Sequence, residues 1–402
     1  MEIKGKKGGD SMKEKVSAVE CGSYELEEVY TSVTEAIRRI GYAVPENKMV
    51  LIKPNVVTQN RPDQHTVTHY IVVDALCRLL SEKNNRILIG DSSAFYMKGL
   101  TARAFETAKL DKVAEKYGAR LVPFEEEAII PVSEGMEGKR VNVIYLPKIL
   151  FEVDMIIDAC KLKTHSALRM SGAIKNMFGC MPGGYKQKVH WWVNNDLELA
   201  DIFLDIIEIT RPVLCVMDAV YGLDGGPSAL GKPVKTSRIL ASTNPAALDF
   251  AACKILGYEP GNIATLIRAK DRHMIEDYDD VEILGDLERV KFNKIAEGPL
   301  KMDYDKDSFM VKYTYTEVKA VHLKDFDSTD YKECIAVCPV NAIKYDEKGK
   351  IYVDRDVCIS CYHCLTACPA GMIKPVPSII NRLGRFAGRA IGVTSENKQL
   401  EE

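Results

Sequence analysis

The chain has 402 residues, of which 46% are apolar and 28% are charged, the balance of a soluble globular protein long enough for two or three domains. Its formal net charge of −3 gives no reason to expect nucleic acid as a partner. No stretch reaches the roughly 18 apolar residues that span a bilayer, so a membrane partner is not expected either.

The chain begins with a polar segment, residues 1–11, which predicts a disordered tail without the apolar run of a signal peptide. Residues 12–290 then alternate strand and helix patterns. Strands are predicted at Val16–Cys21, Met49–Ile52, Arg86–Gly90, Arg120–Pro123, Val141–Leu146, Met155–Lys161, Val213–Asp218 and Arg238–Ser242. Helices are predicted at Leu26–Ile40, Thr68–Lys83 with Thr68 as its N-cap, Thr101–Tyr117, Ala167–Met177, Leu197–Thr210 and Pro245–Leu256. This order is typical of α/β proteins, and we expect two lobes with mainly parallel sheets covered by helices.

Polar side chains gather where the predicted strands end. In open α/β sheets, ligands bind beyond the carboxyl ends of the strands, so these side chains predict a substrate site. The residues after strands are Lys53, Asn55, Asp91, Lys163, His165, Asp218, Gly225 and Gly226, and those on helix starts or loops are His69, Lys175 and Asn176.

The lysines of this group predict the charge of the substrate. Lys163 and Lys175, flanked by Thr, His, Gly and Asn, can bind a phosphate or carboxylate, although each can also be an ordinary surface lysine. His165 can be a general base, a metal ligand or a structural histidine. We assign catalytic roles to Lys163, His165 and Lys175. Binding of a small anionic substrate is assigned to Lys53, Asn55, His69, Asp91, Asn176, Asp218, Gly225 and Gly226.

Simpler roles remain open for several of these residues. His69 can be a helix-end histidine, while Asp91 and Asp218 can bind a metal, orient a histidine or cap a helix. His190–Trp192 is predicted as a loop that acts as a lid or as a contact between lobes or with a partner. The glycine-rich loop Asp224–Gly231 has neither a Walker nor a Rossmann pattern, so no nucleotide is predicted.

The most specific signal lies in residues 325–375, which predict a small α+β ferredoxin-like domain. Its last four cysteines follow the spacing C-x2-C-x2-C-x3-C, with Pro directly after Cys368. In bacterial ferredoxins, three cysteines of such a run and the cysteine of a second Cys-Pro hold one cubane cluster. We therefore predict one 4Fe–4S cluster, with the ligands Cys338, Cys358, Cys361 and Cys364.

The upstream cysteine run is incomplete. Cys334 keeps its position, but Tyr331 and Ser328 stand where two cysteines would be, and two thiolates do not suffice for a second cubane. A structural zinc site is the alternative, but two Cys-Pro runs around the predicted hairpin Ile343–Val353 favour iron and sulfide. The spacing leaves open whether Cys334 and Cys368 form a disulfide or stay as free thiols.

Two segments flank this domain. Residues 291–324 are predicted to be a connector, and residues 376–402 a basic helix with a tail. In Ser378–Gly392, arginines alternate with apolar residues, a pattern that can lie on a membrane but that we expect to dock on the α/β body.

Several motifs together resemble the domain-of-unknown-function family 362. They are Lys53-Pro54-Asn55, Gly90-Asp91-Ser92, Lys163-Thr164-His165, Gly172 through Asn176, Gly225-Gly226-Pro227, and Asn244-Pro245 through Asp249. The resemblance implies no particular reaction, but members often carry a ferredoxin module at the carboxyl end. This chain departs from the family in having Tyr70, where members often have Pro. The module resembles a bacterial-type ferredoxin that has lost one cluster, and single-cluster ferredoxins of that kind can carry a disulfide between the orphan cysteines.

The fusion of a cubane site to a polar-lined α/β domain predicts an iron–sulfur oxidoreductase, in which single electrons pass between the cluster and an anionic small molecule. Two other classes stay open: a non-enzymatic electron carrier or adaptor, and a metal-dependent isomerase or racemase with a structural cluster. A redox protein is a candidate partner. The remaining cysteines stand singly in apolar segments, which points to the reducing cytoplasm of an anaerobe.

Overall fold

The computed structural model of the protein describes residues 13–93, 100–165, 168–225, 231–293, 300, 316–321, 331–368 and 372–377. The predicted tail, Gly226, most of the predicted connector and nearly all of the predicted C-terminal basic helix lie outside these residues. The strands are β1 (Glu14–Glu20), β2 (Met49–Pro54), β3 (Arg86–Asp91), β4 (Arg120–Pro123), β5 (Ile129–Val132), β6 (Ile144–Pro147), β7 (Met155–His165), β8 (Arg169–Ser171), β9 (Leu214–Asp224), β10 (Lys232–Ser242), β11 (Val281–Gly285), β12 (Thr316–Ala320), β13 (Ile343–Tyr345), β14 (Ile351–Val353) and β15 (Ile373–Pro377). The α-helices are α1 (Leu26–Arg39), α2 (Tyr70–Ser81), α3 (Leu100–Thr107), α4 (Leu110–Tyr117), α5 (Ile149–Glu152), α6 (Ala173–Met177), α7 (Tyr185–Trp192), α8 (Asp196–Thr210), α9 (Pro245–Leu256), α10 (Ala264–Asp271), α12 (Lys332–Ala336) and α13 (His363–Ala367).

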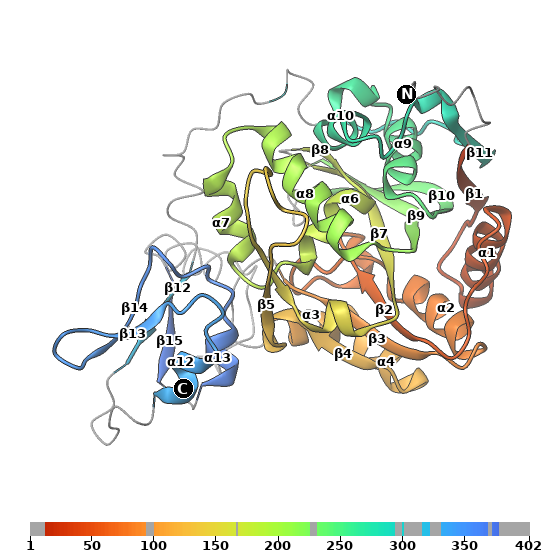
Figure 1. Ribbon diagram of the computed structural model, residues 1–402. Coiled ribbons are helices and arrows are strands. Elements are labelled where there is room, and N and C mark those ends of the chain that lie inside the picture. The colour runs from red at the N-terminus through yellow and green to blue at the C-terminus, as the bar shows by residue number, and fades with distance from the viewer. Residues whose placement is uncertain are drawn as a thin grey trace, which may run out of the picture.

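A single mixed sheet forms the centre of the large domain (Figure 1). Its strand order is β11-β1-β10-β9-β7-β2-β3-β4, with the short β8 paired to β7. Strands β9, β7, β2, β3 and β4 run parallel to one another, whereas β10 is antiparallel to both β1 and β9. The predicted mainly parallel, helix-covered sheet is therefore confirmed. Because β7 pairs with both β2 and β9, the two predicted lobes share one continuous sheet.

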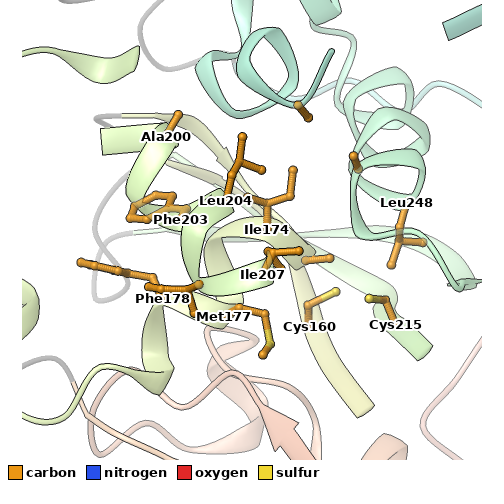
Figure 2. Packing of buried hydrophobic residues seen from close by; sticks show 14 of the residues in the cluster. Cys160, Ile174, Met177, Phe178, Ala200, Phe203, Leu204, Ile207, Cys215 and Leu248 are labelled. Carbon is orange, nitrogen blue, oxygen red and sulfur yellow. The ribbon is translucent and has the colours of Figure 1, made fainter. Parts of the chain in front are cut away.

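Helices cover both faces of this sheet. On one face, α6, α8 and α9 enclose a core that includes Phe203 and Leu248 (Figure 2). On the other face, α1, α2 and α4 bury Val33, Leu76 and Val113. Burying each side chain of this size contributes roughly 1.5–3 kcal/mol to the stability of the fold. Both faces of the sheet are therefore covered by apolar packing. Polar side chains are thereby left to the ends of the strands. None of the described helices is long and apolar enough to cross a bilayer.

One predicted helix is wrong. The segment Ala167–Met177 does not form a single helix, because β7 turns back into β8 and α6 begins only at Ala173. Lys163 pairs with Ser171 across this hairpin, and that pairing overrides the helical spacing of the apolar residues. Arg169 also has a φ of 67°, which a right-handed helix does not allow.

Helix ends and one loop also differ from prediction. The N-cap of α2 is His69 rather than Thr68, because the Thr68 hydroxyl donates to the carbonyl of Ala159 at 2.7 Å. The predicted helix over 101–117 breaks at Lys109, whose φ of 62° separates α3 from α4. The predicted loop His190–Trp192 is helical and ends α7. In the first two cases a tertiary contact or a backbone angle, rather than local propensity, decides where the helix begins or breaks.

The C-terminal module is a small α+β unit beside α7 (Figure 1). Strand β12 pairs with β15, and the predicted hairpin forms with Ile343 opposite Val353. The module has a core of its own, but Ile359 and Cys361 belong to the apolar core of the large domain. So small a module buries little apolar surface by itself, and its contact with the large domain adds to what it buries.

Candidate functional site

The carboxyl ends of β2, β3 and β7 bring together five of the residues predicted to form the site. Lys53 Nζ lies 2.8 Å from Asp91 Oδ1, and both side chains are almost completely buried. Lys163 Nζ donates to Asn55 Oδ1 at 2.6 Å, and Asn55 Nδ2 donates to Asn176 Oδ1 at 2.9 Å. Asn176 Nδ2 reaches the carbonyl of Lys53 at 3.3 Å. The five side chains therefore form one connected polar group at one edge of the sheet.

A second ion pair lies at the end of β9. Lys161 Nζ and Asp218 Oδ2 are 2.9 Å apart, and neither side chain is exposed. Asp218 also accepts the hydroxyl of Tyr24 at 2.8 Å and the backbone N–H of His69 at 2.9 Å. Burial opposes the charge of Asp218, but Lys161 and His69 outweigh it and lower the pKa of this carboxyl group. Both oxygens of Asp218 are thus occupied by protein groups.

Aromatic rings stack above this ion pair. Tyr24 lies on His69 with the ring centroids 3.7 Å apart, and His65 lies on Tyr221 at 4.5 Å. Burial lowers the pKa of His69 to about 4, so its ring is neutral near pH 7. Sequence reasoning missed Tyr24. The signal was available, because Tyr24 follows β1, whose carboxyl end lies at the same edge of the sheet as that of β7.

Lys163 and Lys175 have no carboxylate partner within the part of the chain that the structure describes. Lys163 Nζ donates only to neutral oxygens, Asn55 Oδ1 at 2.6 Å and the carbonyl of Thr66 at 3.2 Å. Burial, followed by the charge of Lys175, lowers the pKa of Lys163 to about 7. Burial, followed by the charge of Lys53, lowers the pKa of Lys175 to about 8. Two neighbouring amines at the site are therefore poised to gain or lose a proton near neutral pH.

Two uncharged imidazoles flank these lysines. Burial and then the charge of Lys175 lower the pKa of His165 well below its usual value and that of His190 to about 4. His165 Nδ1 accepts the backbone N–H of Leu168 at 3.3 Å, so the neutral ring carries its proton on Nε2. His190 reaches the site from α7, and sequence reasoning considered it only as part of a loop.

The start of α6 positions Lys175 and Asn176. The Asp249 carboxylate accepts the backbone N–H groups of the first two residues of α6, at 2.5 and 3.1 Å. Gly172 is required there, because a Cβ atom would lie 2.0 Å from Asp249 Oδ1. Asn176 also donates to Asp158 at 2.6 Å, and burial raises the pKa of Asp158 to about 8. Sequence reasoning missed Asp158, although a carboxyl group inside an apolar strand was a signal.

The glycine loop after β9 is anchored to β7. Gly225 has a φ of 92°, and its N–H donates to Thr164 Oγ1 at 3.0 Å. Gly226, which was assigned to substrate binding with it, lies outside the described residues.

The C-terminal module contains a cavity that opens to solvent, with about 330 Å³ of atom-free space including its open side, and four of its lining residues are Cys338, Cys358, Cys361 and Cys364. The backbone N–H groups of Ala342 and Ser360 donate to two of these sulfurs, at 3.2 and 3.4 Å. Such bonds favour thiolates and tune iron–sulfur clusters. No three His, Cys, Asp or Glu side chains of the described segments are close enough to share a single metal ion. Four sulfurs around one such cavity instead suit a polynuclear cluster.

The two orphan cysteines lie outside the lining of this cavity. The Cys334 thiol donates to Met372 Sδ at 3.9 Å, Cys368 packs in the same small core, and both cysteines are free. Tyr331 is buried in the same small core, and its hydroxyl donates to the carbonyl of Val321 at 2.6 Å. Tyrosine, methionine and thiol groups therefore pack where the upstream run would bind a second cluster.

The module meets the large domain at the loop before α7. A Cβ atom on Gly183 would lie 2.7 Å from the carbonyl oxygen of Cys361, and one on Gly184 would lie 2.4 Å from the Tyr362 hydroxyl. The Gly183 N–H donates to Ser92 Oγ at 2.8 Å, directly after β3. The backbone of the large domain thus touches a cysteine that lines the cavity, and it forms a hydrogen bond with Ser92 at the polar edge of the sheet.

Two family models match the chain. Residues 50–254 match a domain of unknown function, DUF362, and residues 332–372 match a 4Fe–4S dicluster domain. A thylakoid-associated protein of Synechocystis sp. is 30% identical over 265 residues, which are 63% of this chain and 78% of that protein. The apoprotein of lactate racemase from Thermoanaerobacterium thermosaccharolyticum is 12% identical with a TM-score of 0.40, covering 60% of this chain and 56% of that one.

Other relatives match the C-terminal module. The hydrogenase-2 operon protein HybA of Escherichia coli is 37% identical over 71 residues, 17% of this chain and 20% of HybA. The arsenate respiratory reductase iron–sulfur subunit ArrB of Shewanella sp. is 38% identical over 64 residues, 16% of this chain and 25% of ArrB. The chain thus spans a quarter or less of these two proteins. Its C-terminal module is an iron–sulfur electron-transfer domain.

Proposed function

Because the chain belongs to the DUF362 family, whose name assigns no reaction, we propose its function from the site itself: an iron–sulfur oxidoreductase that passes single electrons between a 4Fe–4S cluster and a small anion. The anion binds at Lys163 and Lys175. One cluster is proposed because, among the cysteines the structure describes, only four line the cavity. These are Cys338, Cys358, Cys361 and Cys364.

The contact between the module and the large domain carries this proposal. Cys361 lies in the apolar core of the large domain, and its carbonyl meets Gly183 without room for a side chain. From Gly183 a hydrogen bond leads to Ser92, whose own N–H bonds Asp91 Oδ1 at 2.9 Å. Asp91 is part of the polar group that contains Lys163. A module that only served other proteins would have no need for this packed contact with the polar edge.

The cluster, when bound, supplies or accepts one electron at a time. The residues at the sheet edge supply binding and protons. Lys163 and Lys175 attract the anion, and their lowered pKa values, about 7 and about 8, match proton transfer near neutral pH. His165 adds a neutral N–H donor on Nε2. The backbone carbonyl of Lys53 accepts a hydrogen bond from Asn176, and Asp91 accepts the backbone N–H of Val56, so both residues help to fix the shape of this edge.

A redox protein is the proposed electron donor or acceptor. The hairpin β13–β14 presents Tyr345 and Tyr352, which are 37% and 41% exposed, beside the module that would receive the electron. Aromatic side chains of this kind are common in protein interfaces. The relatives that match this module include an iron–sulfur subunit of a respiratory reductase. Because the cysteines are free, we place the protein in the reducing cytoplasm.

Reoxidation of the cluster tests this proposal. Anaerobic protein is reduced photochemically and mixed with small carboxylates and phosphates that contain a reducible carbonyl, nitro or N–O group, and the visible absorption of the cluster is followed. An acceptor that speeds reoxidation in wild type but not in Lys163→Gln supports the proposal. If every effective acceptor reoxidises both proteins at equal rates, electrons bypass the site and the proposal is wrong.

A further inference from the structure

We propose that the ligand of this site is a dianion, a phosphate monoester or a dicarboxylate, held jointly by Lys163 and Lys175. The inference rests on the proposed function for the identity of the site and adds the chemical class of the ligand. Among the described residues, some charged side chains at the sheet edge have a partner of opposite charge and others do not, and this difference leads to the inference.

The lysines at the sheet edge fall into two pairs. Lys53 has Asp91 at 2.8 Å, and Lys161 has Asp218 at 2.9 Å, so these two charges are balanced inside the protein. Lys163 contacts an amide oxygen and a carbonyl, neither of which carries a full charge. Within the described segments, Lys175 Nζ makes no hydrogen bond or ion pair, and its side chain is partly exposed. Two neighbouring amines thus lack a counter-ion.

The other carboxyl groups nearby are engaged elsewhere. Asp249 caps the start of α6, and burial raises its pKa to about 7. Asp158 is bonded to Asn176, and burial raises its pKa to about 8, so it is largely protonated at neutral pH. Asp249 is held by the start of α6 and Asp158 is largely protonated, so neither forms an ion pair with Lys163 or Lys175. An external ligand has to bring the balancing negative charge, and a monoanion would balance only one of the two amines.

The charged groups around the pair predict how binding depends on pH. Lys163 faces Lys161 on its own strand, Lys175 from α6, Lys53 from β2 and Asp91 from β3. Lys175 faces Lys53, and its charge reaches His165 and His190, which are both neutral. Cations outnumber anions, so the empty site releases protons as the pH rises through 7 to 8. A bound dianion favours the charged form of both lysines and raises their pKa values, so binding at pH 8 should be accompanied by proton uptake.

Calorimetry of anaerobic holoprotein tests the inference. Sulfate and succinate, as dianions, are compared with chloride and acetate at constant ionic strength. We expect the better dianion to bind at least tenfold more tightly than acetate at pH 7, and at least tenfold more weakly at pH 9.5 than at pH 7. Titrations at pH 8 in buffers with different ionisation enthalpies should reveal proton uptake. Tighter binding of sulfate would indicate a compact phosphate-like ligand, and tighter binding of succinate a dicarboxylate.

Matched variants complete the test. Lys175→Gln and Lys163→Gln should each lose the preference for dianions, Lys175→Arg should keep it, and Lys112→Gln, whose side chain is 72% exposed, should match wild type. If a glutamine variant does not fold, the pH dependence of the wild type still decides. Equal affinity for acetate and both dianions, or a preference that survives Lys175→Gln, overturns the inference. Dianion binding without any cluster reoxidation would leave the inference standing and refute the proposed function.

Discussion

The cluster site and the sheet-edge site of this protein differ in how much of their chemistry lies in one short segment. All four proposed cluster ligands fall within residues 338–364, and their spacing predicts a cubane iron–sulfur cluster. The sheet-edge site draws on β2, β3, β7, α6 and α7, which are far apart in the sequence. A cofactor that fixes the spacing of its ligands can be recognised from sequence. When a site depends on which side chains from distant segments pair with one another, its pairing cannot be read from the sequence.

The two sites also differ in how uniform their charged groups are. The four proposed ligand cysteines all have the same role, whereas the four lysines at the sheet edge divide into two that have aspartate partners and two that, in the described part of the chain, do not. Lys53 and Lys161 are held by aspartates, while Lys163 and Lys175 have no carboxylate partner among the described residues, and we propose that these two bind the ligand. Nothing in the sequence separates these lysine pairs, because the difference depends on which carboxylate lies opposite each one.

The largest expected effect comes from removing a cluster ligand. Cys361→Ala should reduce the iron content of anaerobic protein from about four atoms per chain to near zero. It should also destabilise the module, which buries little apolar surface without the cluster. Iron and sulfide analysis measures the effect, with Cys253→Ala as the control that keeps its iron. About eight irons in wild type, zinc instead of iron, or a Cys361→Ala variant with full iron content would each contradict the assignment.

The next prediction weakens the contact between the two sites without replacing a proposed cluster ligand or a residue of the sheet-edge site. In Gly184→Ala the new Cβ would lie 2.4 Å from the Tyr362 hydroxyl, so the Tyr362 ring, or the module that carries it, has to shift away from α7. Iron content should stay near four, but reoxidation of the cluster by an acceptor bound at the sheet edge should slow by roughly tenfold or more, since small displacements at a reacting pair are costly. Gly261→Ala, where nothing lies within 4 Å of the new atom, is the matched control. Equal rates in all three proteins would show that the contact is not used.

Particular residues show how much of the site could be predicted from the sequence. The strand-end rule correctly brought Lys53, Asn55, Asp91 and Lys163 together, because parallel strands end at a common edge, and Asn176, assigned to the site from a helix start, joins them. It did not predict that β7 turns back into β8, since that hairpin depends on pairing between Lys163 and Ser171. It also placed His190 in a loop. Burial against Phe178 and the body of α7, which only the fold determines, brings that imidazole to the site.

A smaller effect should appear in the stability of Lys175→Gln. The pKa of Lys175 is about 8 in the folded protein and 10.5 for an ordinary lysine. Between these values the unfolded chain binds more protons, so wild type should gain stability as the pH rises from 8 to 10.5, by on the order of 2 kcal/mol. The variant should lack this gain. Anaerobic urea unfolding at several pH values measures it, with Lys112→Gln as control, and parallel curves for wild type and Lys175→Gln would refute the charge assignment.

The smallest expected effect concerns Cys334 and Cys368, the two cysteines that we do not assign as cluster ligands. Replacing both Cys334 and Cys368 by alanine should leave the iron content unchanged, because neither lines the cavity, whereas Cys338→Ala should lose the cluster. Iron analysis of the two proteins side by side settles the ligand set. Loss of iron in the double variant together with retention in Cys338→Ala would invert the assignment.

The most direct test of the account is the affinity of sulfate for the oxidised and the reduced protein. If the cluster and the lysine pair are neighbours that work together, the electron added to the cluster repels the anion. Because sulfate is a dianion, this repulsion acts on both of its negative charges, and it is stronger the closer the two sites lie. We expect sulfate to bind reduced wild type severalfold more weakly than oxidised wild type, with a smaller ratio in Gly184→Ala. Equal affinities for the two redox states of wild type would contradict the account.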